Sequence, residues 1–290
     1  AVALKANGEA WAWGSGSTGA LGDETGTGKS SPILVHGNHS FVQVAAGSLN
    51  SAYGRKNNGE VWAWGSGLVG ALGDETVTGK SSPILVHGNH SFIYIAAGYQ
   101  TAAALKANGE AWAWGRGLQG GLGDETAADK SSPVLVHGNH SFIVIVCGLD
   151  NMAALKADGT VWTWGEGLFG ALGNNGTTDK SSPVSVAGNH SFIDIVIGQY
   201  HMLALKVNGE VWAWGYNVGG RLGDETVTQR NSPVLVHGNH SFIGIATGES
   251  CSYARKDSGE AWTWGQNLNG VLGDWTTTNR SSPVAVAGTV

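Results

Sequence analysis

Paired histidines recur along the chain and are the first residues that could carry out chemistry. His36 and His39 lie three residues apart, and copies occur at His87/His90, His137/His140 and His237/His240. Histidine is a common zinc ligand, but a closed zinc site needs about four ligands and each copy supplies two. Ala187 interrupts the pattern. We therefore interpret the histidines as parts of a repeated loop and predict no metal site.

Acidic pairs recur with a similar spacing and would suggest calcium. The copies are Asp23-Glu24, Asp74-Glu75, Asp124-Glu125 and Asp224-Glu225. They lack the alternating oxygen ligands and the central glycine of a calcium loop. A solvated loop or a turn cap is the favoured interpretation, so no cofactor is predicted.

Motifs for catalysis are absent from the sequence. There is no nucleophile elbow, phosphate-binding loop or metalloprotease motif. Cys147 and Cys251 lie in different repeats, and two cysteines do not make a disulfide scaffold. We predict no catalytic residues and a protein that is not an enzyme.

A tryptophan motif reveals the elements that position these residues. Trp11-Ala12-Trp13-Gly14 returns five times, first after 51 residues and then every 50. Self-similarity with such a period is typical of propellers and solenoids. Each motif supplies a pair of tryptophans, and the pairs are Trp11/Trp13, Trp62/Trp64, Trp112/Trp114, Trp162/Trp164, Trp212/Trp214 and Trp262/Trp264.

Repeat three shows most clearly the four short strands that we expect in each unit. Strands A to D are predicted at 92–97, 101–106, 110–114 and 133–137, because these stretches are rich in Val, Ile, Ala and Trp. Asn108-Gly109 between B and C favours a two-residue hairpin with left-handed conformers. Pro133 is predicted to open strand D, which should be the outer strand because an edge tolerates the missing N–H.

Alternation along strand C predicts the structural core. Trp112 and Trp114 should project from one face of a sheet, and Ala111 and Ala113 from the other. Indoles of one sheet can then lie on the alanine face of the next. We predict that all twelve paired tryptophans are core residues rather than exposed sugar-binding platforms.

Several segments of the unit together resemble a known family. The matching segments are Ala96-Ala97-Gly98, Ala104-Leu105, Asn108-Gly109, Trp112 to Gly115, Gly120 to Gly123 and Pro133 to Val136. Their order resembles the unit of the regulator of chromosome condensation repeat family of β-propellers, over essentially the whole chain. The family's turn histidine is retained only as His201, with Ser51, Thr101, Asn151 and Cys251 at the corresponding sites.

The resemblance implies an all-β fold, and the strand count suggests six blades. Strands B, C and D occur six times, but strand A only five times, from Phe41, Phe92, Phe142, Phe192 and Phe242. We predict one domain over 1–290, a six-bladed β-propeller of four-stranded antiparallel blades whose first blade lacks its inner strand. The units are 1–36, 41–87, 92–137, 142–187, 192–237 and 242–287. Continuation past Val290, or a window from a longer array, would each explain the missing strand. Asp194, within strand A, is expected to face a wet central channel.

Comparison of the repeats with one another locates a candidate binding surface. The B–C turns and D–A connections are nearly invariant, whereas the A–B turns and the starts of the C–D loops vary, and both variable sets should lie on one face. Drift at tolerant loops is the alternative explanation. Tyrosine, phenylalanine and arginine are typical interface anchors. The predicted contact residues are Leu49, Asn50, Tyr99, Gln100, Arg116, Gln119, Asp150, Asn151, Glu166, Phe169, Tyr200, His201, Tyr216, Asn217, Glu249, Gln266, Asn269 and Trp275.

Composition excludes some partners of this surface. Net charge is −6, and the 16 Lys and Arg mostly recur at equivalent positions instead of forming a patch, whereas nucleic-acid binders carry a basic face. No apolar run approaches the ~18 residues of a membrane span. We predict no nucleic-acid partner and no membrane insertion.

The leading hypothesis is a non-enzymatic module that binds a protein or a glycan through the variable loops. A structural module of a larger surface or viral appendage is the alternative, and an extracellular or surface location is favoured. The resemblance also implies possible roles in guanine nucleotide exchange or chromatin binding. Exchange is disfavoured because no repeat carries the long inserted hairpin of such exchangers, and the acidic balance disfavours chromatin.

Overall fold

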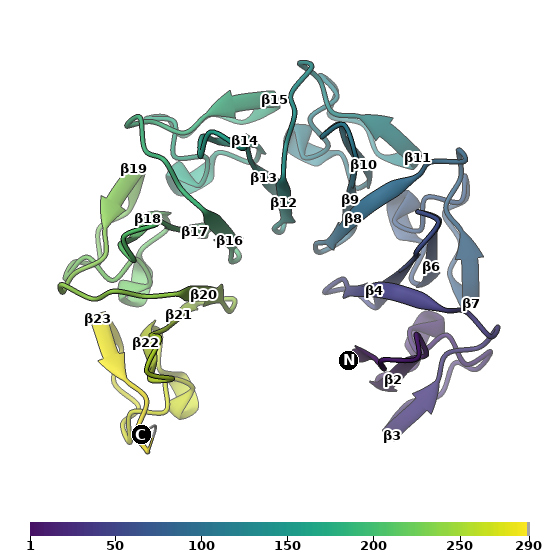
Figure 1. The fold of residues 1–290 in the computed structure, drawn as a ribbon, viewed down its shortest axis with the longest axis horizontal. Helices are drawn as coiled ribbons and strands as arrows, with labels where there is room; N and C mark the ends of the chain where they lie inside the picture. Colours follow the sequence, from purple (N-terminus) through teal and green to yellow (C-terminus); the bar gives the residue numbers. More distant parts are fainter. Residues whose placement is uncertain (289–290) are drawn as a thin grey trace. The chain divides into compact units, whose positions relative to one another are not determined.

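The computed structural model describes residues 1–288 and divides into two compact units, Ala1–Asp150 and Asn151–Val290. Apart from short 3-10 turns, the regular elements of these residues are all β-strands, as predicted (Figure 1). Each repeat contributes one antiparallel sheet whose strands follow chain order.

Unit 1 begins with a sheet of three strands. Strands β1, β2 and β3 correspond to B, C and D, so the first sheet lacks its A strand, as expected. The later sheets of this unit have the order A-B-C-D. The strands are β1 (Val2–Leu4), β2 (Ala10–Gly14), β3 (Lys29–Leu34), β4 (Phe41–Ala46), β5 (Ser51–Lys56), β6 (Val61–Gly65), β7 (Lys80–Leu85), β8 (Phe92–Ala97), β9 (Thr101–Lys106), β10 (Ala111–Gly115), β11 (Lys130–Leu135) and β12 (Val144–Cys147).

Unit 2 repeats the same plan. Its strands are β13 (Asn151–Leu155), β14 (Val161–Gly165), β15 (Lys180–Ser185), β16 (Asp194–Ile197), β17 (His201–Leu205), β18 (Val211–Gly215), β19 (Arg230–Leu235), β20 (Gly244–Thr247), β21 (Cys251–Arg255), β22 (Ala261–Gly265) and β23 (Arg280–Ala285). A 3-10 turn follows each C strand in both units: η1 (Ser17–Gly19), η2 (Leu68–Gly70), η3 (Leu118–Gly120), η4 (Leu168–Gly170), η5 (Val218–Gly220) and η6 (Leu268–Gly270).

Strand D differs from its prediction because of a bulge. Trp112 pairs with Leu135 and Ala113 with Val134, but Gly115 then pairs with Lys130. Because of this irregularity, the backbone pairing of the two strands extends beyond the stretch that the hydrophobic pattern predicts. Strand β11 therefore starts at Lys130, and Pro133 lies inside it rather than at its start. The proline is tolerated because β11 is an edge strand of its sheet.

The B–C turn also differs from its prediction. Gly109 has a φ of +83°, whereas Asn108 is not left-handed. Gly109 N–H donates to Lys106 O, and Lys106 N–H donates to Glu110 O. This pattern fits a longer hairpin that ends in a glycine bulge. Asn108 contributes through its side chain instead, because its Oδ1 accepts from Glu110 N–H at 3.1 Å.

The two tryptophans of each pair have different environments. Trp114 is fully buried, and its Nε1 donates to Ala71 O of the preceding repeat at 3.0 Å. It belongs to one apolar cluster with Ala63 and Tyr53. Indoles of one sheet therefore cover the alanine face of the sheet before it.

Complete burial is shared by the second tryptophan of every pair after the first. Trp214 Nε1 donates to Ala171 O at 3.1 Å, which repeats the bond of Trp114 one hundred residues further along the chain. No part of these indoles reaches the surface, so they cannot contact a partner and are packing residues rather than members of a binding site. The fully buried residues that share this position with Trp114 are Trp64, Trp164, Trp214 and Trp264.

The first tryptophan of each pair is only half-buried, contrary to the expectation that both are core residues. Trp112 lies near the B–C turn, where the Lys106 ammonium sits 4.4 Å from its ring centre and the His90 ring 4.3 Å away. Two residues along strand C therefore separate Trp114, which lies between the sheets, from Trp112, which lies at their edge. The same holds for Trp11, Trp62, Trp162, Trp212 and Trp262, and Trp13 of the first sheet is also half-buried.

Candidate functional site

Hydrogen bonds join the A–B turns and the C–D loops into one surface within each unit, here called the variable face. The Asn50 amide of an A–B turn donates to Ser17 Oγ of a C–D loop at 3.3 Å. Neighbouring A–B turns bond through the backbone, since Leu49 N–H donates to Tyr99 O. The B–C turns and D–A connections form the opposite set, here called the repeated face, where Phe92 N–H donates to Gly59 O.

The variable face of unit 1 is polar and nearly uncharged. Leu49, Asn50, Tyr99 and Gln100 are all half-buried at the surface. Arg116 of a C–D loop forms an ion pair with Asp150, with Nε 3.2 Å from Oδ1. Burial raises the pKa of Asp150, while the Arg116 charge acts in the opposite direction. Asp150 is thus occupied in holding Arg116, whose guanidinium remains a quarter exposed.

The variable face of unit 2 carries an aromatic cluster. The Phe169 ring stacks on the Tyr216 ring at a centroid distance of 4.2 Å, and Tyr200 meets Phe169 edge-on at 5.7 Å. These residues come from a C–D loop, an A–B turn and the next C–D loop. The structure thus brings together three side chains that the sequence selected separately.

Arg221 packs against this cluster and was not among the predicted contact residues. Its guanidinium lies 4.8 Å from the Tyr216 ring centre, Nε donates to Val218 O, and Nη1 donates to Glu249 O. Burial lowers the pKa of Arg221. The other repeats carry Ala20, Ala71, Gly121, Ala171 and Val271 here, so comparing repeats at this position could have identified it.

The 3-10 turns of the variable face hold unusual backbone conformations. Val69, Gln119 and Phe169 have φ values between +53° and +59°. A left-handed conformation is costly for a β-branched or bulky residue, and such strain is found preferentially at functional sites. The equivalent residues are Thr18, Gly219 and Asn269, so side-chain identity at this position is not dictated by the backbone.

Exposed leucines precede these left-handed residues and were also missed by the sequence reasoning. Leu68 and Leu118 of unit 1 are 56% and 44% exposed, and Leu168 and Leu268 of unit 2 are 44% and 67% exposed. Their regular spacing after Trp-Gly resembles a core signal. Only the tight turn, which points the side chain outward, reveals them as surface residues.

Four predicted contact residues are buried and serve the scaffold instead: Asp150, which holds Arg116, and Asn151, His201 and Asn217. Asn151 and His201 begin B strands and are at most 4% exposed, like Ser51 and Thr101 at the same position. Asn217 is fully buried, and its amide bonds Asp224, Thr226 and Thr228 while its Oδ1 accepts from Leu222 N–H. These residues brace loops and neighbouring sheets, so they are removed from the candidate surface. Complete burial also excludes a set of tryptophans from that surface: Trp64, Trp114, Trp164, Trp214 and Trp264.

The remaining predicted residues lie at the surface. Glu166 and Gln266 are half-buried, and Glu249 and Asn269 are exposed. Trp275 is 90% exposed but occupies a different part of its C–D loop. The equivalent Glu24 donates its N–H to Ser81 O of an outer strand. Position 275 therefore belongs to the part of the loop that faces an outer strand in the other repeats, rather than to the part that contacts the A–B turns.

His201 and Ser252 form a pair of catalytic residue types, but their geometry is structural. His201 Nε2 lies 3.0 Å from Ser252 Oγ, and Ser252 Oγ–H donates to Arg221 O at 2.8 Å. The histidine therefore donates to the serine instead of accepting its proton. Both side chains are fully buried, and burial lowers the pKa of His201 to about 3. This arrangement links adjacent sheets and cannot activate a nucleophile.

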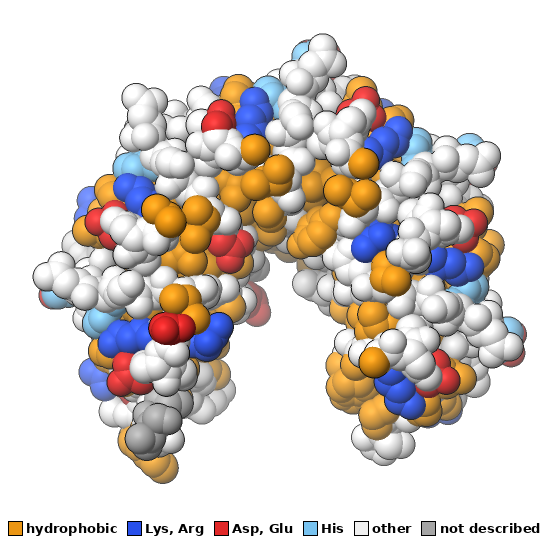
Figure 2. All heavy atoms as spheres, in the orientation of Figure 1, with side chains coloured by type: hydrophobic (Ala, Val, Ile, Leu, Met, Phe, Trp, Pro, Cys, Tyr) orange, Lys and Arg blue, Asp and Glu red, His pale blue; other side chains and the backbone are white. Residues whose placement is uncertain are grey.

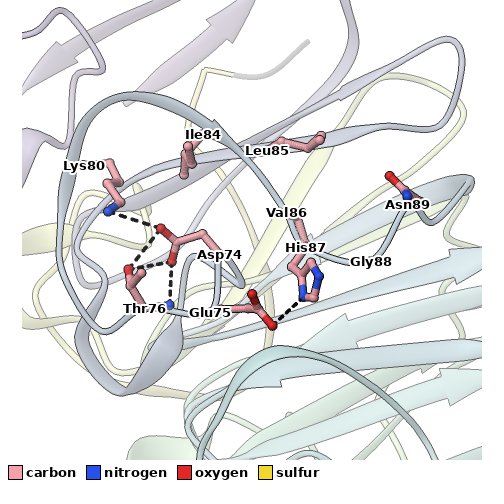
Figure 3. A pocket seen from close by; sticks show the side chains of 10 residues that line it. All are labelled: Asp74, Glu75, Thr76, Lys80, Ile84, Leu85, Val86, His87, Gly88 and Asn89. Carbon is pink, nitrogen blue, oxygen red and sulfur yellow. Dashed lines mark hydrogen bonds and ion pairs between the residues drawn. The ribbon is translucent and has the colours of Figure 1, made fainter.

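The acidic and histidine pairs contact one another at the outer strands. Around a surface hollow of about 390 Å³ in the second repeat, His87 Nδ1 lies 2.9 Å from Glu75 Oε1 (Figure 3). Asp74 accepts from Thr76 Oγ1, and the Lys80 ammonium lies 3.3 Å from Asp74 Oδ2, where a cation would otherwise bind. Residues 1–288 contain no group of three or more potential metal ligands.

Other titratable groups do not form a reactive centre. Burial raises the pKa of the Cys147 thiol to about 12, so it stays protonated at neutral pH. Burial also raises the pKa of the half-buried Asp194, whose Oδ1 accepts from Ile195 N–H. Lys, Arg, Asp and Glu lie in small mixed groups instead of single-sign patches (Figure 2). Within residues 1–288, no helix is long and apolar enough to cross a membrane.

Comparisons with known proteins agree with this architecture. The mouse E3 ubiquitin-protein ligase HERC2 is 33% identical over 109 residues, covering 36% of this chain and 2% of HERC2. The chain thus matches a small fraction of that relative. Prp20p from Saccharomyces cerevisiae has a TM-score of 0.86 at 22% identity, covering 99% of this chain and 75% of Prp20p.

A second solved structure, human WBSCR16, has a TM-score of 0.85 at 20% identity over 96% of this chain and 76% of its own. At these identities the structural likeness shows the β-propeller fold alone. The RCC1-like domain family matches residues 1–290. The chain therefore belongs to the RCC1-like domain family and has the β-propeller fold.

Proposed function

We propose that this chain is a non-enzymatic scaffold that recognises a protein partner through the variable face. The observation that carries the proposal is the left-handed turn of each C–D loop. Val69, Gln119 and Phe169 occupy a conformation that glycine or asparagine would adopt at lower cost. Val69, Gln119 and Phe169 are half-buried at the surface, and bulky, varied side chains at such a strained position are expected where the side chain is selected for contact.

The composition of the face supports a protein partner. Exposed Leu68 and Leu118 lie on the same loops as the variable residues, and apolar anchors rimmed by Asn and Gln are typical of protein interfaces. In the solved relatives, the study of Prp20p concerns its binding to Gsp1p and histones, and another structure shows Kap60 bound to Prp20. These partners belong to Prp20, but they support protein recognition by this fold.

A protein is favoured over a glycan by the packing of the aromatic cluster. A sugar ring would need an open aromatic face. The Phe169 ring stacks on Tyr216, and the Arg221 guanidinium also lies over the Tyr216 ring. Tyr200 meets Phe169 edge-on. Such a cluster offers ring edges and hydroxyl groups, which suit an irregular protein surface.

Nucleotide exchange remains disfavoured. Within residues 1–288, each loop between strands C and D contains one 3-10 turn. None of these loops contains an inserted hairpin. The scaffold proposal therefore does not depend on a GTPase partner.

Affinity capture from the source organism, followed by titration of the captured protein, tests the proposal. Tyr99→Ala with Gln119→Gly alters the face of unit 1, and Phe169→Gly with Tyr200→Ala alters that of unit 2. A contact hot spot contributes about 2 kcal/mol or more, so affinity should fall roughly 30-fold or more in at least one variant. The melting temperature of that variant should remain near the parent value.

Val207→Ala provides the matched control, because Val207 is 85% exposed in a B–C turn of the repeated face. The control should bind like the parent. Binding that survives both variable-face variants, or that is lost in the control, would contradict the proposal. Purified Gsp1p serves as a separate probe, and accelerated nucleotide release would favour exchange instead.

A further inference from the structure

The repeated face carries a sequence that neither the scaffold nor the proposed binding role explains. Asn38-His39-Ser40 fits the pattern Asn-x-Ser, in which x is not proline, and this pattern marks acceptors for N-linked glycans. It recurs in every D–A connection between the repeats: Asn89-His90-Ser91, Asn139-His140-Ser141, Asn189-His190-Ser191 and Asn239-His240-Ser241.

The structure accounts for two of the three residues. His90 packs against Trp112 and Phe92 at centroid distances of 4.3 and 5.0 Å. Ser91 Oγ donates to Asn58 O at 3.4 Å, and Ser141 Oγ donates to Asn108 O at 3.1 Å. Histidine and serine therefore have structural reasons to recur.

The asparagine side chain has no such reason. Asn38, Asn89, Asn139 and Asn189 are exposed, with φ between +47° and +49°. Figure 3 shows Asn89 on its loop at the margin of the neighbouring hollow, with no hydrogen bond drawn to the other labelled side chains. A left-handed turn explains asparagine or glycine equally well, and the backbone does not require an amide.

Two other left-handed positions show that a left-handed backbone does not by itself keep one residue type in every repeat. The 3-10 turn position holds Thr18, Val69, Gln119, Phe169, Gly219 and Asn269 in successive repeats. The C–D loop position holds Glu in four repeats, with Asn175 and Trp275 in the others. The D–A position is asparagine in all five copies, even where Ala187 replaces the histidine two residues earlier.

From these observations we infer that Asn38, Asn89, Asn139, Asn189 and Asn239 are acceptors for N-linked glycans. In the transfer, asparagine Nδ2 forms a bond to C1 of the sugar as the bond between C1 and the diphosphate of a lipid-linked oligosaccharide donor breaks. The amide loses one proton, and the lipid diphosphate leaves. This inference goes beyond the binding proposal and does not depend on it.

The geometry permits glycans at these positions without disturbing the scaffold. The Asn amides protrude from exposed loops, and Phe41 and Phe92, which begin the next strands, keep their backbone bonds to Gly8 and Gly59. The modified positions belong to the repeated face, whereas the Leu68 and Leu118 turns belong to the variable face. Glycans here would cover the surface that is the same in each repeat and leave the diversified loops accessible.

Secretion of the whole chain from insect cells behind a cleavable signal peptide tests the inference. Released protein is treated with peptide-N-glycosidase in heavy-oxygen water, which converts each occupied asparagine to labelled aspartate. Peptide mapping should find the label at Asn38, Asn89, Asn139, Asn189 and Asn239. The exposed Asn57, which is followed by Asn58-Gly59, should stay unlabelled.

Single substitutions sharpen the test at one repeat. Asn89→Gln and Ser91→Ala should each remove one glycan from the intact mass, whereas Ser91→Thr should retain it. Asn89→Gly, which suits the left-handed turn, should also remove it with no loss of melting temperature. Two solitary motifs, Asn175-Gly176-Thr177 and Asn279-Arg280-Ser281, supply a comparison within the chain. Folded, secreted protein that is unmodified at the five repeated sites, or modified only at the solitary ones, would overturn the inference.

Discussion

The two faces of the repeats use their side chains in opposite ways. On the repeated face, His90 packs against Trp112, Ser91 bonds a B–C turn, and Lys106 lies over the same indole. On the variable face, backbone bonds such as Leu49 N–H to Tyr99 O hold neighbouring A–B turns together, so the side chains of Leu49 and Tyr99 are not needed for that contact. Sequence is thus retained where side chains build the scaffold and diverges where the backbone alone suffices.

Substitutions in the tryptophan pair give the largest expected effect on stability. Trp114→Ala removes a fully buried indole and its bond to Ala71 O, which should lower the free energy of unfolding by about 3–5 kcal/mol. Trp112→Ala removes a half-buried indole and its contact with Lys106, which should cost about 1–2 kcal/mol. Urea denaturation of both variants measures the difference. Equal losses would show that the distinction between buried and marginal indoles is wrong.

Acid should weaken the scaffold through its buried histidines. Burial is the main cause that lowers the pKa of His39, His90, His190 and His240, and it lowers that of His201 from 6.5 to about 3. The unfolded chain therefore takes up protons that the folded chain does not. Stability is fully present above the ordinary histidine pKa and is lost as pH falls through it towards the folded values.

For His201 alone, the loss between pH 7.5 and pH 5 should be about 2 kcal/mol. His201→Asn, which places the residue of Asn151 at this position, should remove that part of the pH dependence. Asn151→Ser, which changes the equivalent buried position without a titratable group and copies Ser51, should leave the dependence unchanged. Chemical denaturation at the two pH values checks both variants. An unchanged slope in His201→Asn would show that the folded chain protonates His201 after all.

A matched pair of substitutions compares the faces directly. His90→Ala removes the ring contacts with Trp112 and Phe92 and should lower stability by about 1 kcal/mol. Tyr99→Ala removes a half-buried side chain but leaves the backbone bonds of residue 99, such as its N–H to Gly148 O, in place. The free energy of unfolding should therefore stay within about 0.5 kcal/mol of the parent value. Thermal unfolding measures both. A larger loss in Tyr99→Ala would assign the variable face to the scaffold.

Local patterns in the sequence were sufficient for strands A and B of repeat three, whereas the A strands predicted from Phe142, Phe192 and Phe242 begin two residues later. Residues 92–97 and 101–106 were predicted as strands and are β8 and β9. These elements are specified by alternation within one repeat. The start of strand D was missed because the bulge at Gly115 depends on how the C–D loop folds back, which alternation does not encode.

The site was harder to predict because contacts between repeats determine whether each of its residues is buried or exposed. His201 and Asn217 vary from repeat to repeat as surface residues do, yet both are fully buried. Their burial follows from a neighbouring sheet or loop that no single repeat contains. Leu68 of η2 was not among the predicted contact residues, although its side chain is exposed.

The smallest effect addresses the strain of the variable face. Val69 has a φ of +54°, and a left-handed conformation costs an L-residue about 1–2 kcal/mol. Val69→Asn, which copies Asn269, should therefore raise the free energy of unfolding by about 1 kcal/mol. Val69→Gly should gain less, because glycine also increases the entropy of the unfolded chain.

The reverse substitution, Gly219→Val, should lower stability by a similar amount, since Gly219 has a φ of +80° and an added Cβ would meet the Gln266 side chain. Denaturant midpoints of the three variants measure these changes. If Val69→Asn is stabilised yet loses affinity for the captured partner, the strain is retained for recognition. If it is destabilised, Val69 belongs with the scaffold residues, and the contrast between the faces does not extend to this turn.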